Sequence, residues 1–115
     1  MKRGDVVVAD IAFSDRQGTK VRPCVVVSAD ANNTAIQDVI LVAVSRSTRP
    51  GALTHVAVDP ATSDGKIAGL LHRSYIQCEN IFTLDKKFVL NTIGALTPSL
   101  LRQLNENLKR ALDLP

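Results

Sequence analysis

Aromatic residues and cysteines are scarce in this 115-residue chain, and long hydrophobic runs are missing. It has no tryptophan, one tyrosine and three phenylalanines, too few for a platform on which successive nucleic-acid bases stack. No stretch reaches the ~18 consecutive apolar residues of a membrane span. Met1-Lys2-Arg3 leads directly into a strand-like segment, without the apolar region of a secretion signal. We therefore expect a cytosolic (cytoplasmic) protein that does not enter a membrane.

The two cysteines, Cys24 and Cys78, lie far apart in apolar segments, without a CxxC pattern or histidine-rich surroundings. They are predicted to be buried free thiols, not a disulfide or a metal site. No set of ligand residues recurs at metal-binding spacing, and the sequence has no glycine-rich phosphate loop. We therefore expect no metal and no cofactor.

Composition places the chain among ordinary globular proteins. Apolar residues make up 45% and charged residues 22%, enough apolar mass for a real core. The length fits one domain, residues 1–115. Fourteen basic and 11 acidic residues give a net charge of +3, spread without a polybasic tail. This mild excess is compatible with nucleic-acid binding but does not demonstrate it, so any binding surface has to be assembled by folding.

Short apolar segments separated by turn residues predict several strands followed by one helix. Pro23 is expected to open the second strand, because proline is tolerated at a strand's first residue. Thr97 and Pro98 begin an amphipathic helix with leucines at helical spacing. This order predicts a mainly β (α+β) fold, a small antiparallel β-barrel or strongly bent sheet covered by a C-terminal helix. The expected strands are 5–12, 24–28, 39–44, 54–58, 70–80 and 87–96, and the longer loops are 13–21, 30–38, 45–53 and 59–69.

Strand order predicts where the polar loops meet. Short connections make consecutive strands antiparallel neighbours, so the strand from Cys24 pairs with the strand ending at Val44. Arg22 and Ser45 then become neighbours. The strand from Thr54 starts at the same end of the barrel, and the first polar loop is attached there. The predicted cluster consists of Asp15, Arg16, Lys20, Arg22, Ser45, Arg46, Arg49 and His55.

Such a cluster has groups suited to cleaving RNA without a metal. Attack of a 2′-hydroxyl on the adjacent phosphorus needs an acceptor for its proton, a cation for the phosphoryl charge, and a proton for the leaving 5′-oxygen. Arginine suits the second task, because its planar fork matches phosphate oxygens. A neighbouring serine can donate to the same phosphate. On spacing alone, however, an arginine before a proline is more often a solvated surface residue, and Ser45, His55 and His72 have equally ordinary structural explanations.

Five pieces of the chain resemble the MazF/PemK (Kid-like) toxins, in the same order. Arg3-Gly4-Asp5 precedes a β run, and Arg22-Pro23 is followed by an apolar run that ends at Ser28. The remaining similarities are Ala43-Val44-Ser45, Ala68-Gly69-Leu70-Leu71 together with residues 81–86, and Ile93-Gly94-Ala95-Leu96-Thr97-Pro98. The resemblance spans residues 2–114.

This resemblance implies a CcdB/Kid-like SH3-type antiparallel barrel, a homodimer, and the toxin of a type II toxin–antitoxin pair. It implies a metal-independent, sequence-specific endoribonuclease acting on single-stranded RNA. The family's catalytic arginine falls on Arg22 and its threonine on Ser45. Gln77 stands where some members carry arginine, while Glu79 keeps a carboxylate. Together, the cluster and the resemblance give a substrate-binding set of Asp15, Gln17, Lys20, Arg46, Arg49, His55, Gln77, Glu79 and Asn80.

The expected partners are single-stranded mRNA, a cognate antitoxin, and operator DNA only as part of a toxin–antitoxin complex. Two alternatives share the fold. One is a CcdB-like topoisomerase (gyrase) poison, which binds protein and needs no catalytic residues. The other is a catalytically silent nucleic-acid-binding autorepressor. The convergence of Arg22 and Ser45 favours the ribonuclease.

Overall fold

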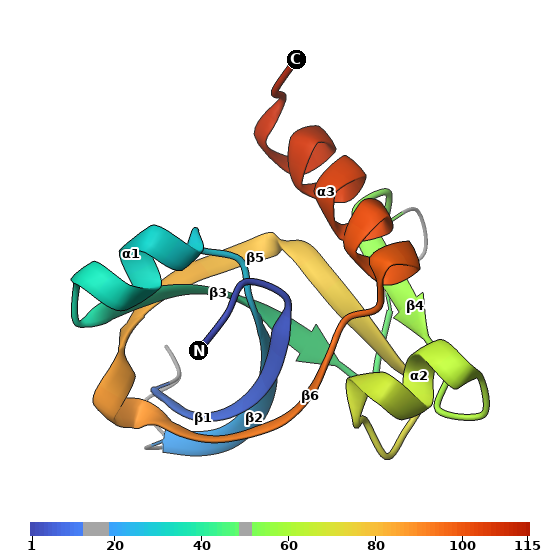
Figure 1. Cartoon of the computed structure of the whole chain (residues 1–115). Helices are drawn as coiled ribbons and strands as arrows, with labels where there is room; N and C mark the ends of the chain where they lie inside the picture. The colour runs from blue at the N-terminus through green and yellow to red at the C-terminus, as the bar shows by residue number, and fades with distance from the viewer. Residues whose placement is uncertain (13–18, 49–51) are drawn as a thin grey trace.

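The computed structural model describes residues 1–12, 19–48 and 52–115. Within these residues, six strands form one antiparallel sheet in the order β4-β5-β3-β2-β1-β6. Figure 1 shows the sheet curling into a ring, with α3 packed outside it. The elements are β1 (Asp5–Ala12), β2 (Thr19–Val26), α1 (Asp30–Ala35), β3 (Asp38–Ser45), β4 (His55–Val58), α2 (Ser63–Ala68), β5 (Ser74–Asp85), a 3-10 turn (Lys86–Phe88), β6 (Val89–Ala95) and α3 (Pro98–Leu112).

The sheet is a strongly curled, open version of the predicted barrel. Strands β4 and β6 are its two edges, and in the described residues they pair with β5 and β1 and not with each other. Helix α2 instead packs closely against β6, because Gly69 and Gly94 lack the side chains that would keep their backbones apart. The predicted fold class, an antiparallel β structure with a C-terminal helix, is confirmed.

Alternate strand residues face two apolar cores, as the period of two in a β-strand requires. Val6 and Val25 belong to one core, which α3 covers with Leu100 and Leu104. The other core is enclosed by the curl of the sheet and consists of Val7, Ala9, Cys24, Val26, Val39 and Leu41, with Ile11, Phe82, Leu84 and Val89 packed against it.

The C-terminal helix begins as the sequence predicts. The Thr97 hydroxyl accepts a hydrogen bond from the Leu100 amide, and Pro98 occupies the first turn. Arg3 fastens this helix to the sheet, because its Nη2 donates to Asn105 Oδ1 at 2.8 Å while its Nε donates to the Val27 carbonyl at 3.0 Å. The orientation of α3 is therefore set by a polar clasp as well as by leucine packing.

Two short helices occupy segments expected to be loops. In α1, Asn33 is buried and donates to the Ser28 carbonyl at 3.0 Å, so a tertiary contact overrides the turn-rich composition. In α2, the Thr62 hydroxyl accepts from the Gly65 amide at 3.0 Å. Gly69 ends that helix at φ +77°.

The bounds of β2 and β5 differ most from the prediction. Pro23 lies inside β2, opposite Val8, and does not open the strand. Strand β2 pairs with β3 only from Cys24 onward, so at Pro23 the recorded pairing is with β1 alone, and the missing N–H is tolerated. Strand β5 begins at Ser74 and runs unbroken to Asp85, although the expected strand covers residues 70–80.

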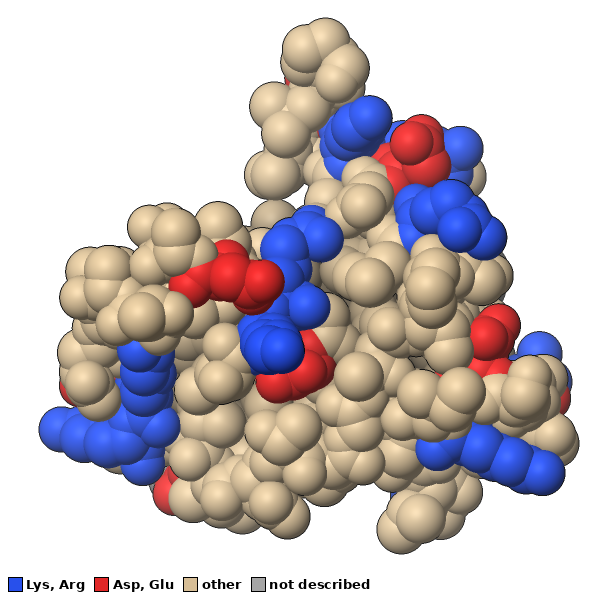
Figure 2. Space-filling model, in the orientation of Figure 1, with Lys and Arg blue, Asp and Glu red and all other residues tan. Residues whose placement is uncertain are grey.

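On the face of the molecule shown in Figure 2, the charged side chains lie in small groups. Basic and acidic groups lie next to each other on this mostly uncharged face, without a continuous basic stripe. None of the helices in the described part of the chain is long and apolar enough to span a membrane.

Candidate active site

The β2–β3 pairing brings together the two residues that topology predicts as neighbours. The recorded pairing ends where Cys24 pairs with Ala43, two residues short of Arg22 and Ser45, which lie just beyond it on the two strands. Both side chains line an open cavity of about 1170 Å³. The cavity lies where β2 and β3 extend past their shared pairing, so the side chains there are accessible.

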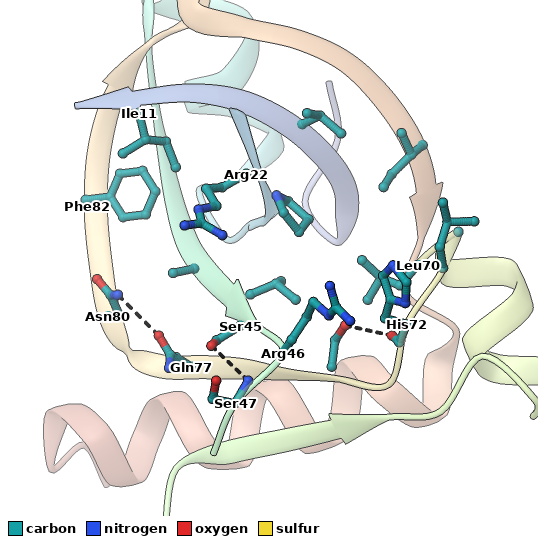
Figure 3. A pocket seen from close by; sticks show the side chains of 18 of the residues that line it. Ile11, Arg22, Ser45, Arg46, Ser47, Leu70, His72, Gln77, Asn80 and Phe82 are labelled. Carbon is teal, nitrogen blue, oxygen red and sulfur yellow. Dashed lines mark hydrogen bonds between the residues drawn. The ribbon is translucent and has the colours of Figure 1, made fainter. Parts of the chain in front are cut away.

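The cavity is walled by β1, β2, β3, β5, β6 and the turn after α2. In the close-up, Ser45 and Arg46 lie in the middle, Gln77 and Asn80 at one end, and His72 and Leu70 at the other (Figure 3). The apolar part of the lining is Val8, Ile11, Pro23, Ala43, Val44, Leu70, Leu71, Phe82, Leu84 and Ile93.

The charged side chains among the cavity's described lining residues are of one sign. Arg22 and Arg46 line the cavity, and the described residues lining it include no aspartate or glutamate. The Ser47 amide donates to Ser45 Oγ at 3.1 Å, which leaves the Ser45 hydroxyl proton available for another acceptor. Two guanidinium groups and a hydroxyl donor around one space form a site for a phosphate or another anion.

The side chains of Gln77 and Asn80 line the same cavity. They are linked by a hydrogen bond of 3.3 Å from Asn80 Nδ2 to Gln77 Oε1 (Figure 3). Strand β5 changes register here, since Val42 pairs with Ile81 but Ala43 pairs with Gln77. The extra residues bend β5 and turn the Asn80 side chain toward the cavity.

His55 and Glu79 lie near this site but are not among the residues lining the cavity. His55 Nε2 lies 2.9 Å from Glu79 Oε2, and Thr54 Oγ1 donates to Glu79 Oε1 at 2.5 Å. Partial burial of Glu79 by itself raises the pKa of its carboxyl. The hydrogen bonds from Thr54 and His55 outweigh that effect, so the pKa lies below the usual range of glutamate.

The remaining predicted binding residues are not brought into the cavity by the described structure. Lys20 is exposed on β2, opposite Ile11, and does not line the cavity. Asp15, Gln17 and Arg49, and likewise Arg16, lie outside the described residues.

Several residues that line or support the cavity were not predicted from the sequence, among them His72, Ser74 and Phe82. His72 lines it, and buried Ser74 donates from its hydroxyl to the His72 carbonyl at 2.7 Å. Phe82 lines the apolar part. The available signal for His72 was the cap pair Thr62 and Gly69, which would have revealed α2 and the turn that carries His72.

The cysteines behave as predicted. Cys24 and Cys78 are buried free thiols, and burial raises the pKa of each to about 12, with a further contribution from the Glu79 charge at Cys78. No group of three or more metal-ligating side chains occurs in residues 1–12, 19–48 and 52–115.

A strongly curled, open antiparallel sheet with a C-terminal helix and a cavity lined by two arginines at one end defines a small β protein whose cavity could accept an anion. Residues 2–112 match the family of PemK-like, MazF-like toxins of type II toxin–antitoxin systems, and the chain belongs to this family.

Individual relatives cover almost the whole chain. The chain is 32% identical to the endoribonuclease EndoA of Bacillus subtilis over 117 residues, 99% of this chain and 96% of the relative. It is 30% identical to the endoribonuclease MazF4 of Mycobacterium tuberculosis over 113 residues, 98% of this chain and 93% of the relative. A mycobacterial endoribonuclease solved with its cognate antitoxin superposes with a TM-score of 0.81 at 30% identity, covering 100% of this chain and 97% of the other.

Proposed function

We propose that this toxin is an endoribonuclease that cleaves single-stranded RNA, mRNA in particular, at a phosphate held by Arg22 and Ser45. One observation carries the assignment. Arg22 and Ser45 both line one cavity, whose described charged residues are all basic, and this supports the assignment. The relatives that cover nearly the whole chain are named endoribonucleases, which supports the same activity here.

The chemistry needs no metal. The substrate's own 2′-oxygen forms a bond to phosphorus while the bond to the 5′-oxygen breaks, which gives a 2′,3′-cyclic phosphate and a 5′-hydroxyl. Arg22 stabilises the charge that develops on the phosphoryl oxygens, because its guanidinium stays charged and donates two parallel hydrogen bonds. The Ser45 hydroxyl donates a hydrogen bond to the same phosphate and fixes the position of that phosphate.

Two protons also have to move, one from the 2′-hydroxyl and one to the 5′-oxygen. His72 lines the cavity, and an imidazole has one nitrogen that can accept a proton and one that can donate it. We assign one of the two transfers to His72.

RNA contacts extend from the reacting phosphate in both directions. Arg46 meets a neighbouring phosphate, and the Gln77 and Asn80 carboxamides offer donors and acceptors to a base edge. Lys20, together with Asp15, Gln17 and Arg49, stays in the proposed binding set as predicted from the sequence.

The proposed partners follow from the family and its solved complexes. The similar mycobacterial endoribonuclease was solved with its cognate antitoxin, which supports an antitoxin partner for this chain. We propose that the toxin is a homodimer, works in the cytoplasm where mRNA is translated, and contacts operator DNA only when bound to its antitoxin.

The decisive experiment incubates the purified protein with a long unstructured RNA in EDTA. The wild type cleaves it, and Arg22→Ala lowers the rate by ~10²-fold or more, as expected for loss of a preorganised donor. Arg102→Ala is the matched control, because this exposed arginine lies on α3 outside the cavity. Circular dichroism checks that each variant is folded.

If the wild type and both variants leave the RNA intact, the protein is not a ribonuclease. Inhibition of DNA gyrase by a wild type that leaves RNA intact would favour the topoisomerase poison instead. Binding of RNA or operator DNA without cleavage or gyrase inhibition would favour the silent autorepressor.

A further inference from the structure

Strand β5 carries extra residues at one point, and this irregularity connects two parts of the molecule. Its pairing with β3 steps from Ile81 to Gln77 while β3 advances by a single residue, from Val42 to Ala43. Cys78, Glu79 and Asn80 therefore form a bulge. Within it, Cys78 is buried, while the two polar residues are exposed.

The bulge is fastened to the start of β4 by three hydrogen bonds. The Cys78 amide donates to the Thr54 carbonyl at 3.2 Å. Each carboxylate oxygen of Glu79 has its own partner, Oε1 with the Thr54 hydroxyl at 2.5 Å and Oε2 with His55 Nε2 at 2.9 Å. With both oxygens engaged, Glu79 is held in one orientation.

The His55 ring connects Glu79 on one side to Thr48 on the other. Its Nε2 faces a carboxylate and so carries a proton, while its Nδ1 lies 3.0 Å from Thr48 Oγ1. The neutral ring accepts from this hydroxyl, and the protonated ring donates to it. The His55 side chain is only 5% exposed, so the ring cannot reach RNA without breaking these contacts.

Thr48 lies three residues after Ser45, at the end of the described segment that leaves β3. Within this segment, the Ser47 amide donates to Ser45 Oγ. A series of contacts therefore connects the β5 bulge, through Glu79 and His55, to Thr48. Thr48 belongs to the same short segment as Ser45, Arg46 and Ser47, in which the Ser47 amide holds Ser45 Oγ. Displacing reacting groups by about 1 Å can lower an enzymatic rate by ~10²-fold.

We propose that Thr48, Thr54, His55 and Glu79 form a clamp that positions Ser45 and Arg46 for RNA cleavage. His55 and Glu79 are then positioning residues, a role different from the RNA contact predicted from the sequence. The inference rests on the proposed ribonuclease function, since Ser45 and Arg46 matter through the reaction they serve.

The test measures kcat and KM for cleavage of a long unstructured RNA by Glu79→Ala, His55→Ala and the double variant. Each single variant lowers kcat ~10- to 100-fold, the size of effect known for residues that orient metal ligands, and leaves KM within about threefold. The double variant is no slower than the slower single one, because both remove the same clamp. Glu79→Gln keeps one acceptor oxygen and recovers most of the rate.

Two features keep the test decisive. Glu79 is 44% exposed, so Glu79→Ala folds even if buried His55 does not tolerate replacement. Glu106→Ala removes an exposed carboxylate on α3, away from the cavity, and serves as the matched control with unchanged kcat. A raised KM with unchanged kcat would show that Glu79 and His55 contact RNA, and wild-type kinetics in both variants would refute the clamp.

A spectroscopic readout separates the clamp from the activity. In the wild type, ¹⁵N NMR of His55 shows a protonated Nε2, and hydrogen exchange at the Ser47 amide is slow; both features are lost in Glu79→Ala. If both signals are lost in Glu79→Ala but the wild type does not cleave RNA, the clamp is supported and the ribonuclease is rejected. Signals unchanged in Glu79→Ala would overturn the clamp whatever the activity.

Discussion

Replacing Gly94 by alanine tests the close approach of β6 to α2 at one wall of the cavity. A Cβ at residue 94 would lie 2.3 Å from the Ala68 carbonyl oxygen and 2.5 Å from that of Ile67. Both contacts involve helix backbone, which cannot rotate away as a side chain would. To restore ordinary contact, β6 and α2 have to separate by about 1 Å.

The expected cost follows from this overlap. Gly94 is not among the residues with positive φ, so an alanine there adds no left-handed backbone strain and the loss is steric. Overpacking of a tight contact costs ~1–3 kcal/mol. We expect the upper end, about 3 kcal/mol, because the separation also disturbs Ala68 and Leu70, which are buried in the core under α3.

Urea unfolding followed by far-UV circular dichroism measures this loss. Protein concentration has to be held fixed, since a dimer would gain stability with concentration. Thr92→Ala is the control on the same strand, because Thr92 is exposed and its replacement changes stability by less than about 0.5 kcal/mol. If Gly94→Ala were as stable as Thr92→Ala, the close approach of α2 and β6 would be wrong.

Three further predictions concern chemistry. Cys24 and Cys78, whose pKa burial raises to about 12, stay unreactive to Ellman's reagent at about pH 8 until urea exposes them; rapid labelling of the folded protein would contradict their burial. The pKa of Glu79 is lowered in the folded protein, so its contribution to stability is present above the usual glutamate pKa of about 4.3 and is lost as the pH falls through the lower folded value. The difference in unfolding free energy between wild type and Glu79→Gln therefore shrinks from about pH 6 to about pH 3. A difference that stays constant over this range would refute the prediction. RNA cleavage survives EDTA but fails on a substrate with one deoxynucleotide 5′ of the scissile phosphate; restoration of a lost activity by magnesium would reject the mechanism.

The elements that carry strong local signals could be predicted from the sequence. The β-branched run from Asp5 gave β1 with its observed bounds, and Thr97-Pro98 marked the start of α3. The helices α1 and α2 escaped because each has only six residues, too few for a hydrophobic period to be visible. Their stability comes from contacts that a local pattern does not contain, such as the buried amide of Asn33.

The site residues, too, fall into some that could be predicted from the sequence and some that could not. That Arg22 and Ser45 line the same cavity could be predicted, since it needs only antiparallel pairing of two consecutive strands. The places of Asn80 and Glu79 could not, because they depend on the register change in β5, and a bulge leaves no mark in a run of alternating residues. His72 depends on a turn that follows an unpredicted helix.

The two-core arrangement of the sheet also bears on how such a toxin can change its target. Ser47 and Asn80 line the cavity but hold no reacting phosphate and move no proton, and both belong to neither apolar core. Exposed positions of this kind tolerate substitution with stability changes of only about 0.5 kcal/mol. Recognition can therefore drift at these positions while the folded scaffold stays constant, so a library randomised there can yield folded nucleases with altered RNA preference.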